Sequence, residues 1–399
     1  MTLINSDALQ NPIPPQRFSL LALGFRPFFL LAGIAAIGLM LWWVAVLLSL
    51  VRVGGYYSAI GWHSHEMIFG FATAVLAGFL LTAVRNWTGV QTLKGMWLAA
   101  LVGLWLAARV LPLLVTDLPP WLIAAVDLAF LPLLTVSLAV PILRGKKRPQ
   151  LIFIALLALM FLANLLVHLE LLGVTQDGAR SGIGLGINTL LLIITIMAGR
   201  VLPMFTKNGA PGAEPRRWPW LEKTTIAVML ALLLVELVYP APWLIAVLAA
   251  SAVLAHAARL WGWYSRLIWA VPLLWVLHLG YSWLVLGFVL KVLATLGMVE
   301  AVPAMHAFAA AISVLCLGMM SRVALGHTAR PLVAAGVMAW AFVLINLAMA
   351  VRVWVPIVAL EWGALANFIS AGLWLLAFAV FVFVYMPILS RARLDGQPG

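Results

Sequence analysis

Long apolar stretches recur along this chain of 399 residues, and they decide its fold class. A stretch of about 20 apolar residues crosses the hydrocarbon core of a bilayer as an α-helix, because a helix satisfies its own backbone hydrogen bonds. Hydrophobic residues make up 65% of the sequence and charged residues 9%, where soluble domains carry about 25% charged residues. The sequence therefore predicts an all-α, polytopic integral membrane protein.

The apolar stretches predict about 12 transmembrane helices. They cover residues 27–51, 62–84, 96–115, 119–143, 151–173, 183–205, 222–239, 241–260, 268–296, 301–321, 331–352 and 359–388. The longest polar break, 206–220, divides a single transmembrane domain (20–390) into six plus six spans. Residues 1–19 are expected to form a flexible cytoplasmic leader, and residues 391–399 a cytoplasmic tail.

Basic residues predict the orientation of the bundle. With both chain ends placed inside, 19 of the 24 Lys and Arg residues fall on the cytoplasmic side, as the positive-inside rule requires. The five on the outer side are Arg52, Arg109, Arg180, Lys291 and Arg352. This partition accounts for the net charge of +12, so we expect membrane lipid and not nucleic acid as the partner of the basic residues.

The seven histidines are the most informative residues, because imidazole is the commonest metal ligand and ionisable groups inside spans are costly. Four of them fall near the outer ends of their spans: His63, His65, His168 and His306. The other three lie toward the inner side: His256, His278 and His327. A helix rise of about 1.5 Å per residue separates the two layers by roughly 15–25 Å, which favours two sites over one shared site.

His63 and His65 stand at the start of one span and cannot both face one point if both are helical, because residues i and i+2 point about 200° apart. Either His63 lies in a pre-helical turn, or one histidine binds a cofactor while the other contacts something else. On an α-helix, Glu66 and Met67 share the face of His63, which would place a carboxylate and a thioether beside an imidazole. We expect His65 to meet the cofactor.

Ordinary structural roles compete with these interpretations. A histidine near a helix end can bond interfacial water, which suffices for His168 beside Glu170 and for His256 one turn from Arg259. A solvated basic loop suffices for His327. His278 and His306 lie in apolar sequence, so each needs a polar partner or a ligand. The single cysteine, Cys316, excludes an internal disulfide, a thiolate zinc site and an iron–sulfur cluster.

Seven segments together resemble the NnrS family of polytopic bacterial inner-membrane proteins. They are GFRPFFLLAG (24–33), WHSHEMIFGFATAVLAGFLLTAV (62–84), NWTG (86–89), GRVLPMFT (199–206), LHLGYSWL (277–284), MHAF (305–308) and LGMMSRVALGHTARPL (317–332). The resemblance implies haem and copper as cofactors and a role in the nitric oxide response or in denitrification. Carried over by position, it implicates His63, His65, Glu66, Arg200, His278, His306, Arg322, His327 and Arg330.

Three functions remain open on the sequence. The first is a haem- and copper-binding protein that handles nitric oxide, with His63, His65 and His306 at an outer site and His278 and His327 at an inner one. The second is a transporter of a small solute or metal complex, in which the intramembrane carboxylates Asp127 and Glu236 move protons. The third is a haem–copper redox enzyme acting on nitric oxide or oxygen.

Overall fold

The structure, a computed structural model, describes residues 18–114 and 118–397. Its helices are α1 (Phe25–Leu47), α2 (Ala59–His65), η2 (Glu66–Ala72), α3 (Thr73–Thr88), α4 (Gly95–Leu114), α5 (Pro120–Arg144), η3 (Arg148–Gln150), α6 (Leu151–Leu171), α7 (Gly178–Gly209), α8 (Pro219–Val238), α9 (Pro242–Trp263), η4 (Arg266–Ala270), α10 (Pro272–Thr295), α11 (Ala301–His327), α12 (Gly336–Val358), η5 (Leu360–Trp362) and α13 (Gly363–Ser390). Because α2, η2 and α3 form one continuous helix, Ala59–Thr88, the described residues contain twelve long helical units.

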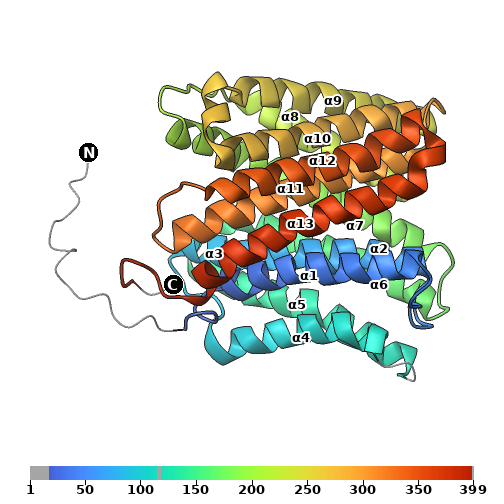
Figure 1. Cartoon of the computed structure of the whole chain (residues 1–399), viewed down its shortest axis with the longest axis horizontal. Helices are drawn as coiled ribbons and strands as arrows, with labels where there is room; N and C mark the ends of the chain where they lie inside the picture. Colours follow the sequence, from blue (N-terminus) through green and yellow to red (C-terminus); the bar gives the residue numbers. More distant parts are fainter. Residues whose placement is uncertain (1–17, 115–117, 398–399) are drawn as a thin grey trace.

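The predicted membrane-spanning bundle is confirmed, with one difference. Eleven of the units in the described residues are long and apolar enough to cross a membrane. The unit outside this group is α8, which carries Glu222, Lys223 and Glu236. The helices lie side by side along one direction, with α8 and α9 at one edge and α4 at the other (Figure 1).

The helix ends differ from the predicted ones by a few residues. The second span begins at Ala59 and not at 62, so His63 and His65 both lie inside a helix. The longest predicted loop, 206–220, is shorter in the structure because α7 continues to Gly209 and α8 begins at Pro219. Most of the predicted leader lies outside the described residues.

Both described chain ends lie at the same end of the bundle. Phe18 pairs with Arg391 in an isolated β-bridge, and Ser19 N–H donates to the carbonyl of Ser390 over 2.8 Å. Figure 1 shows the two ends together at the left. Because both described chain ends lie at the same end of the bundle, the chain runs along the bundle an even number of times. The cytoplasmic location of this end remains a prediction.

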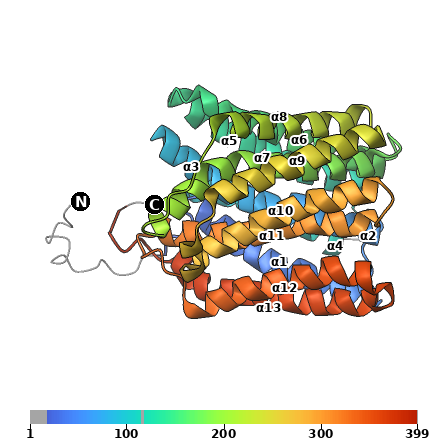
Figure 2. The same ribbon diagram turned by 90° about the horizontal axis from the view of Figure 1, so that it is seen from above.

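Four helical units form the interior. Buried residues make up 83% of the most apolar window of Ala59–Thr88 and of α11, against 22% in α1. The other two are α7 and α10. The second view shows α10 and α11 in the middle of the bundle and α12 and α13 along its side (Figure 2). The outer ends of these interior helices carry the polar groups described next.

Candidate functional site

The helix that carries His63 and His65 changes its winding directly after them. Ser58 caps α2 by accepting a hydrogen bond from the N–H of Gly61 over 3.1 Å, and the next seven residues, Glu66–Ala72, form a π-helix. Such segments are rare and frequent at functional sites. With both histidines helical, their side chains leave α2 on opposite sides and enter different environments.

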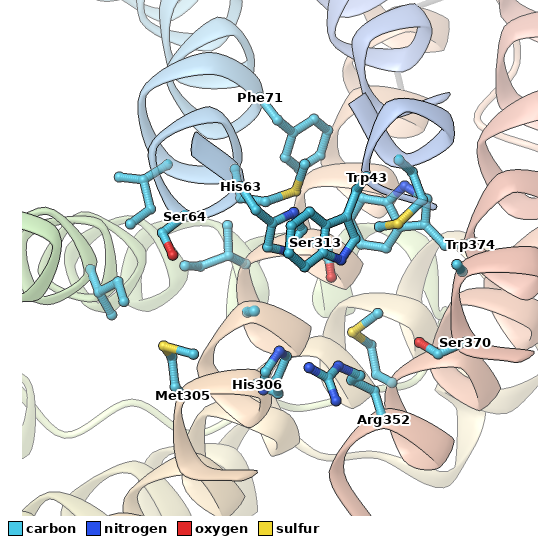
Figure 3. Close-up of a pocket in the computed structure, with 18 of the residues that line it drawn as sticks. Trp43, His63, Ser64, Phe71, Met305, His306, Ser313, Arg352, Ser370 and Trp374 are labelled. Atoms are coloured by element: carbon cyan, nitrogen blue, oxygen red, sulfur yellow. The ribbon is translucent and has the colours of Figure 1, made fainter. Parts of the chain in front are cut away.

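His63 faces a cavity that we call the histidine cavity. His306 of α11 and Arg352 of α12 line it as well, and its remaining walls come from α1, η2, α7 and α13. Its empty volume, including its open mouth, is about 1030 Å³. Figure 3 shows His63 and Trp43 on one side of the space and His306 and Arg352 on the other. A concave and mostly apolar space with a few convergent polar groups is typical of a ligand-binding pocket.

The two imidazoles of the cavity have nitrogens without a protein partner. Nδ1 of His306 lies 2.9 Å from the carbonyl of Val302. Since a carbonyl only accepts, the proton sits on Nδ1 and Nε2 carries a lone pair. The His63 ring stacks on Trp43 with centroids 4.4 Å apart, and its Nδ1 is buried without a hydrogen-bond partner. Buried polar atoms are normally paired, so a ligand is expected here.

The rest of the cavity wall combines one cation with sulfur and aromatic groups. Arg352 supplies a guanidinium, which suits a carboxylate or another oxyanion. The indole of Trp374 is held in place by its N–H, which donates to the carbonyl of Ala36 over 2.9 Å. Four methionines line the same space: Met40, Met67, Met305 and Met349. This lining fits a planar apolar ligand that carries an anionic group.

His65 points away from the cavity into what we call the buried polar network. It consists of His65, Glu66, Arg109, Asp127, Asn164 and His168. Arg109 of α4 donates to Oε2 of Glu66 over 3.1 Å and also pairs with Oδ1 of Asp127 on α5. Asn164 of α6 donates to Oδ2 of Asp127 over 2.6 Å. Each of these side chains is buried, and the single guanidinium balances only one of the two carboxylate charges away from water.

Two imidazoles converge on one carboxylate oxygen in this network. Oδ2 of Asp127 lies 3.2 Å from Nε2 of His65 and 2.9 Å from Nε2 of His168. One ligand atom from each residue lies within 4.8 Å of the other two. Two histidines and one carboxylate are a donor set that transition metals use. The buried His–Asp–His group could therefore hold a metal ion.

The hydrogen bonds around His65 call for a positive charge at this point. Its Nδ1 lies 3.3 Å from Oε1 of Glu66, a carboxylate paired with Arg109, so this nitrogen carries a proton. Its Nε2 then faces Oδ2 of Asp127 and, at 2.9 Å, Oδ1 of Asn164, which are both acceptors. Only a proton or a metal cation between Nε2 and these oxygens makes the contact favourable, and so the residues present fit a metal.

Two tyrosines of the loop before α2 close the network on its outer side. The hydroxyl of Tyr56 lies 2.7 Å from Nδ1 of His168, and that of Tyr57 lies 3.5 Å from Nε2 of His65. Burial raises the pKa of Tyr56, and burial together with the charge of Glu66 raises the pKa of Tyr57. Both phenols therefore stay neutral. Tyr56 can fix the orientation of the His168 ring, as outer partners do for metal-bound histidines.

The inner histidines that the sequence singled out do not meet. Nδ1 of His278 lies 3.0 Å from the carbonyl of Leu274, while the ring of His327 contacts that of Phe25 at a tilt of 44°, with centroids 5.7 Å apart. Within the described residues, no hydrogen bond or ring contact joins these two histidines. The structure therefore does not bring His278 and His327 into contact, as it does the outer histidines His65 and His168. A cofactor site formed by His278 and His327 stays a prediction.

The three basic residues carried over from the family have separate partners near the inner side. Arg200 donates to Oε1 of Gln150 over 2.9 Å. The guanidinium carbon of Arg322 lies 4.0 Å from the ring centroid of Phe205. Arg330 lies in the loop after α11, where burial and the nearby Arg391 lower its pKa. Their expected cofactor contacts remain predictions.

Sequence reasoning missed four of the six residues of the buried polar network. It gave His168 an interfacial role, Asp127 a proton-carrying role in a transporter and Arg109 a place among the outer basic residues, and it gave Asn164 no place in a site. It also placed Glu66 on the face of His63, whereas the structure pairs it with His65 and Arg109. Met67 keeps the expected face, because it lines the histidine cavity with His63, whereas the carboxylate of Glu66 is turned toward Arg109. A basic residue inside an apolar outer-side stretch was the available signal for Arg109.

Comparison with protein families gives the same result as the motifs. The NnrS protein family model matches residues 19–393. The chain belongs to the NnrS family. No curated protein matches it. Family membership supports a membrane protein related to the nitric oxide response, and the eleven long apolar helices among the described residues make it a multi-pass one.

Proposed function

We propose that this NnrS protein binds haem in the histidine cavity and a second metal ion, copper, in the buried polar network, and that it handles nitric oxide in the bacterial inner membrane. The observation that carries the proposal is the opposite placement of His63 and His65. One side of α2 presents a cavity with unpaired imidazole nitrogens, and the other presents two imidazoles and a carboxylate around one point.

His306 is the residue that would hold the haem iron. Its Nδ1–H donates to a backbone carbonyl, which leaves the Nε2 lone pair available, as is usual for metal-bound histidines. Arg352 would pair with a haem carboxylate, and the aromatic wall of Trp43 and Trp374 would exclude water. His63 then remains across the cavity to donate a hydrogen bond to a small bound molecule. When bound, haem supplies an iron that coordinates nitric oxide.

His65, Asp127 and His168 would hold the second metal. Arg109 pairs with Oδ1 of Asp127, which leaves Oδ2 beside the two imidazoles, and the Nδ1 atoms of His65 and His168 are oriented by Glu66 and Tyr56 respectively. The two centres would be neighbours because His63 and His65 leave the same turn of α2. This separation of roles assigns His65 to the metal and His306 to the haem.

Absorption spectra and metal analysis of the purified protein test these assignments. We expect a Soret band in the wild type, its loss in His306→Ala with the second metal kept, and the reverse pattern in His168→Ala. Each variant is the matched control of the other, because both remove an outer-layer imidazole. A Soret band that survives in His306→Ala would overturn the haem assignment, and joint loss of both metals in both variants would indicate one shared site.

Growth under nitric oxide stress tests the physiological part. A bacterial strain that lacks the protein should regain resistance when it expresses the wild type and should fail to regain it with His306→Ala. Equal protection by both, at equal protein levels, would show that the cavity does not serve this role.

A further inference from the structure

Two other hollows adjoin the histidine cavity, and they differ in polarity. The first, which we call the apolar groove, lies between α1, α3, α7 and α11. Its lining is hydrocarbon, aromatic ring and sulfur throughout, and includes Val75, Phe79, Ile194, Cys316 and Met319. Two further residues, Leu190 and Ile312, line both the groove and the cavity. The groove therefore reaches the cavity wall.

The mouth of the apolar groove faces the middle of the bilayer. Ile194 is near the midpoint of α7, which has 32 residues, and Cys316 near that of α11, which has 27. Both side chains, with Phe79 and Met319, are partly exposed, whereas the neighbouring groove residues are mostly buried. In a bundle that spans the membrane, this opening meets hydrocarbon and not water.

The second hollow, which we call the polar vestibule, lies between α7, α8, α10 and α11 near their outer ends. Arg180, Asn188, Glu236, Lys291 and Thr295 line it. Nζ of Lys291 lies 2.5 Å from Oε1 of Glu236, and Asn188 donates to Oε2 of the same carboxylate over 2.8 Å. Charged groups inside a bundle pair with one another or line a water-filled cavity, and this partly exposed pair does both because it lines a hollow.

The polar vestibule touches the histidine cavity at a different wall. Ile187 and Met305 line both spaces. Met305 directly precedes His306 on α11. The histidine cavity therefore adjoins the apolar groove on the lipid side and the polar vestibule on the outer side.

We propose that the apolar groove admits an uncharged diatomic gas from the bilayer to the histidine cavity, while the polar vestibule is the separate route for water and ions. The proposal rests on the proposed function for what the cavity holds. A small apolar gas prefers hydrocarbon to water, and rotamer changes of Leu190 and Ile312 suffice to let it pass. An ion cannot use the groove, because no group there replaces its hydration.

Carbon monoxide rebinding after flash photolysis of the reduced haem protein tests the groove. Cys316→Trp fills the mouth of the groove, and its bimolecular rebinding rate should fall about tenfold, which corresponds to a barrier higher by about 1.4 kcal/mol. Met319→Trp is a second variant of the same kind in case the first does not fold. Unchanged rebinding rates in both folded variants would overturn the proposal.

A second apolar surface groove supplies the matched control. It lies between α9 and α10, and none of its lining residues lines the histidine cavity. Val285→Trp at this position adds the same bulk to a partly exposed apolar site, so it should leave rebinding unchanged. A rate that falls equally in Val285→Trp and Cys316→Trp would show a general effect of the added indole and would contradict the assigned route.

Azide binding to the oxidised haem protein at pH 8 probes the other route with an anion. Thr295→Trp narrows the polar vestibule and should slow azide binding without changing carbon monoxide rebinding. Cys316→Trp should show the opposite pattern. If either Thr295→Trp or Cys316→Trp slowed both azide binding and carbon monoxide rebinding, the two probes would share a single entrance. That result would overturn the proposal.

A haem-independent measurement separates this proposal from the proposed function. Absence of a Soret band would defeat the haem assignment alone. In crystals held under xenon, an apolar gas should then still be found between Leu190, Ile312 and Cys316. Xenon absent from this position in the wild type would refute the gas route even if haem is bound.

Discussion

Histidine side chains on the two sides of α2 lie in different environments. On one side, among the described residues, Nδ1 of His63 and Nε2 of His306 have no hydrogen-bond partner in the protein. On the other side, the ring nitrogens of His65 and His168 all contact side-chain oxygen atoms, which belong to Tyr56, Glu66, Asp127 and Asn164. Since buried polar groups are normally satisfied, we propose an organic ligand on the first side and a compact cation on the second.

The arginines on the two sides of α2 also have different surroundings. Arg109 lies between two carboxylates in the buried polar network, whereas Arg352 faces the cavity. A buried ion pair adds little net stability as a whole, but the loss of one partner leaves the other buried and uncompensated. The network should therefore tolerate substitution far less well than the cavity.

Replacing Arg109 and Arg352 should reveal the largest difference in stability between the buried polar network and the histidine cavity. Arg109→Leu leaves Glu66 and Asp127 without their counter-ion, and we expect a loss of about 3–5 kcal/mol of stability. Arg352→Leu should cost about 1 kcal/mol or less, because its guanidinium lies beside open space. Thermal unfolding followed by circular dichroism in detergent measures both. Equal melting temperatures for the two variants would show that the network is not under the inferred electrostatic constraint.

Two glycines test the packing around Arg109. A Cβ at Gly70 would lie 2.7 Å from Oε2 of Glu66 and 3.0 Å from Nη1 of Arg109, so Gly70→Ala should destabilise the fold by about 1–3 kcal/mol. Gly103→Ala on α4 is the control, because nothing lies within 4 Å of its Cβ position. A melting temperature that drops for Gly103→Ala as much as for Gly70→Ala would contradict the close approach as the cause.

Tyr56 allows a finer test of the metal assignment. Tyr56→Phe removes the hydroxyl beside Nδ1 of His168, and outer partners of this kind change metal affinity by about 10–100-fold. Competition with a chelator measures the affinity. Tyr57→Phe, whose hydroxyl is 3.5 Å from His65, should have a smaller effect. The assignment fails if Tyr56→Phe binds metal as tightly as the wild type does.

His63→Ala should give the smallest of these effects. If His306 holds the iron, the variant keeps its Soret band but loses a hydrogen-bond donor to a bound gas. We expect nitric oxide dissociation to accelerate about fivefold, since one hydrogen bond contributes about 1 kcal/mol. Stopped-flow spectroscopy with a nitric oxide trap gives the rate. Complete loss of haem would instead make His63 an iron ligand.

The transporter hypothesis is weakened by the same comparison. Asp127 is held by Arg109, Asn164 and His168, and Glu236 by Lys291 and Asn188. A carboxylate that carries protons across the membrane must exchange them with water on both sides. Asp127 is 3% exposed and pairs with a guanidinium, which favours a fixed charge.

The sequence by itself determined the bundle and the family, and it required opposite directions for His63 and His65 if both are helical, a condition that the structure meets because α2 begins at Ala59. These features follow from local physics: apolar length sets the span, and 100° per residue sets the face. It also placed four histidines in one layer, because helix rise converts position into depth.

Only the tertiary structure decided which groups meet within that layer. Asp127, Arg109 and His168 come from three consecutive helices, and nothing in their spacing states how those helices rotate about their axes. Glu66 turns to Arg109 of α4, a partner that lies 43 positions away and that helical spacing within one span cannot indicate. Helix rotation and local winding are set by packing against neighbours, so side-chain partners across helices emerge only when the whole bundle is assembled.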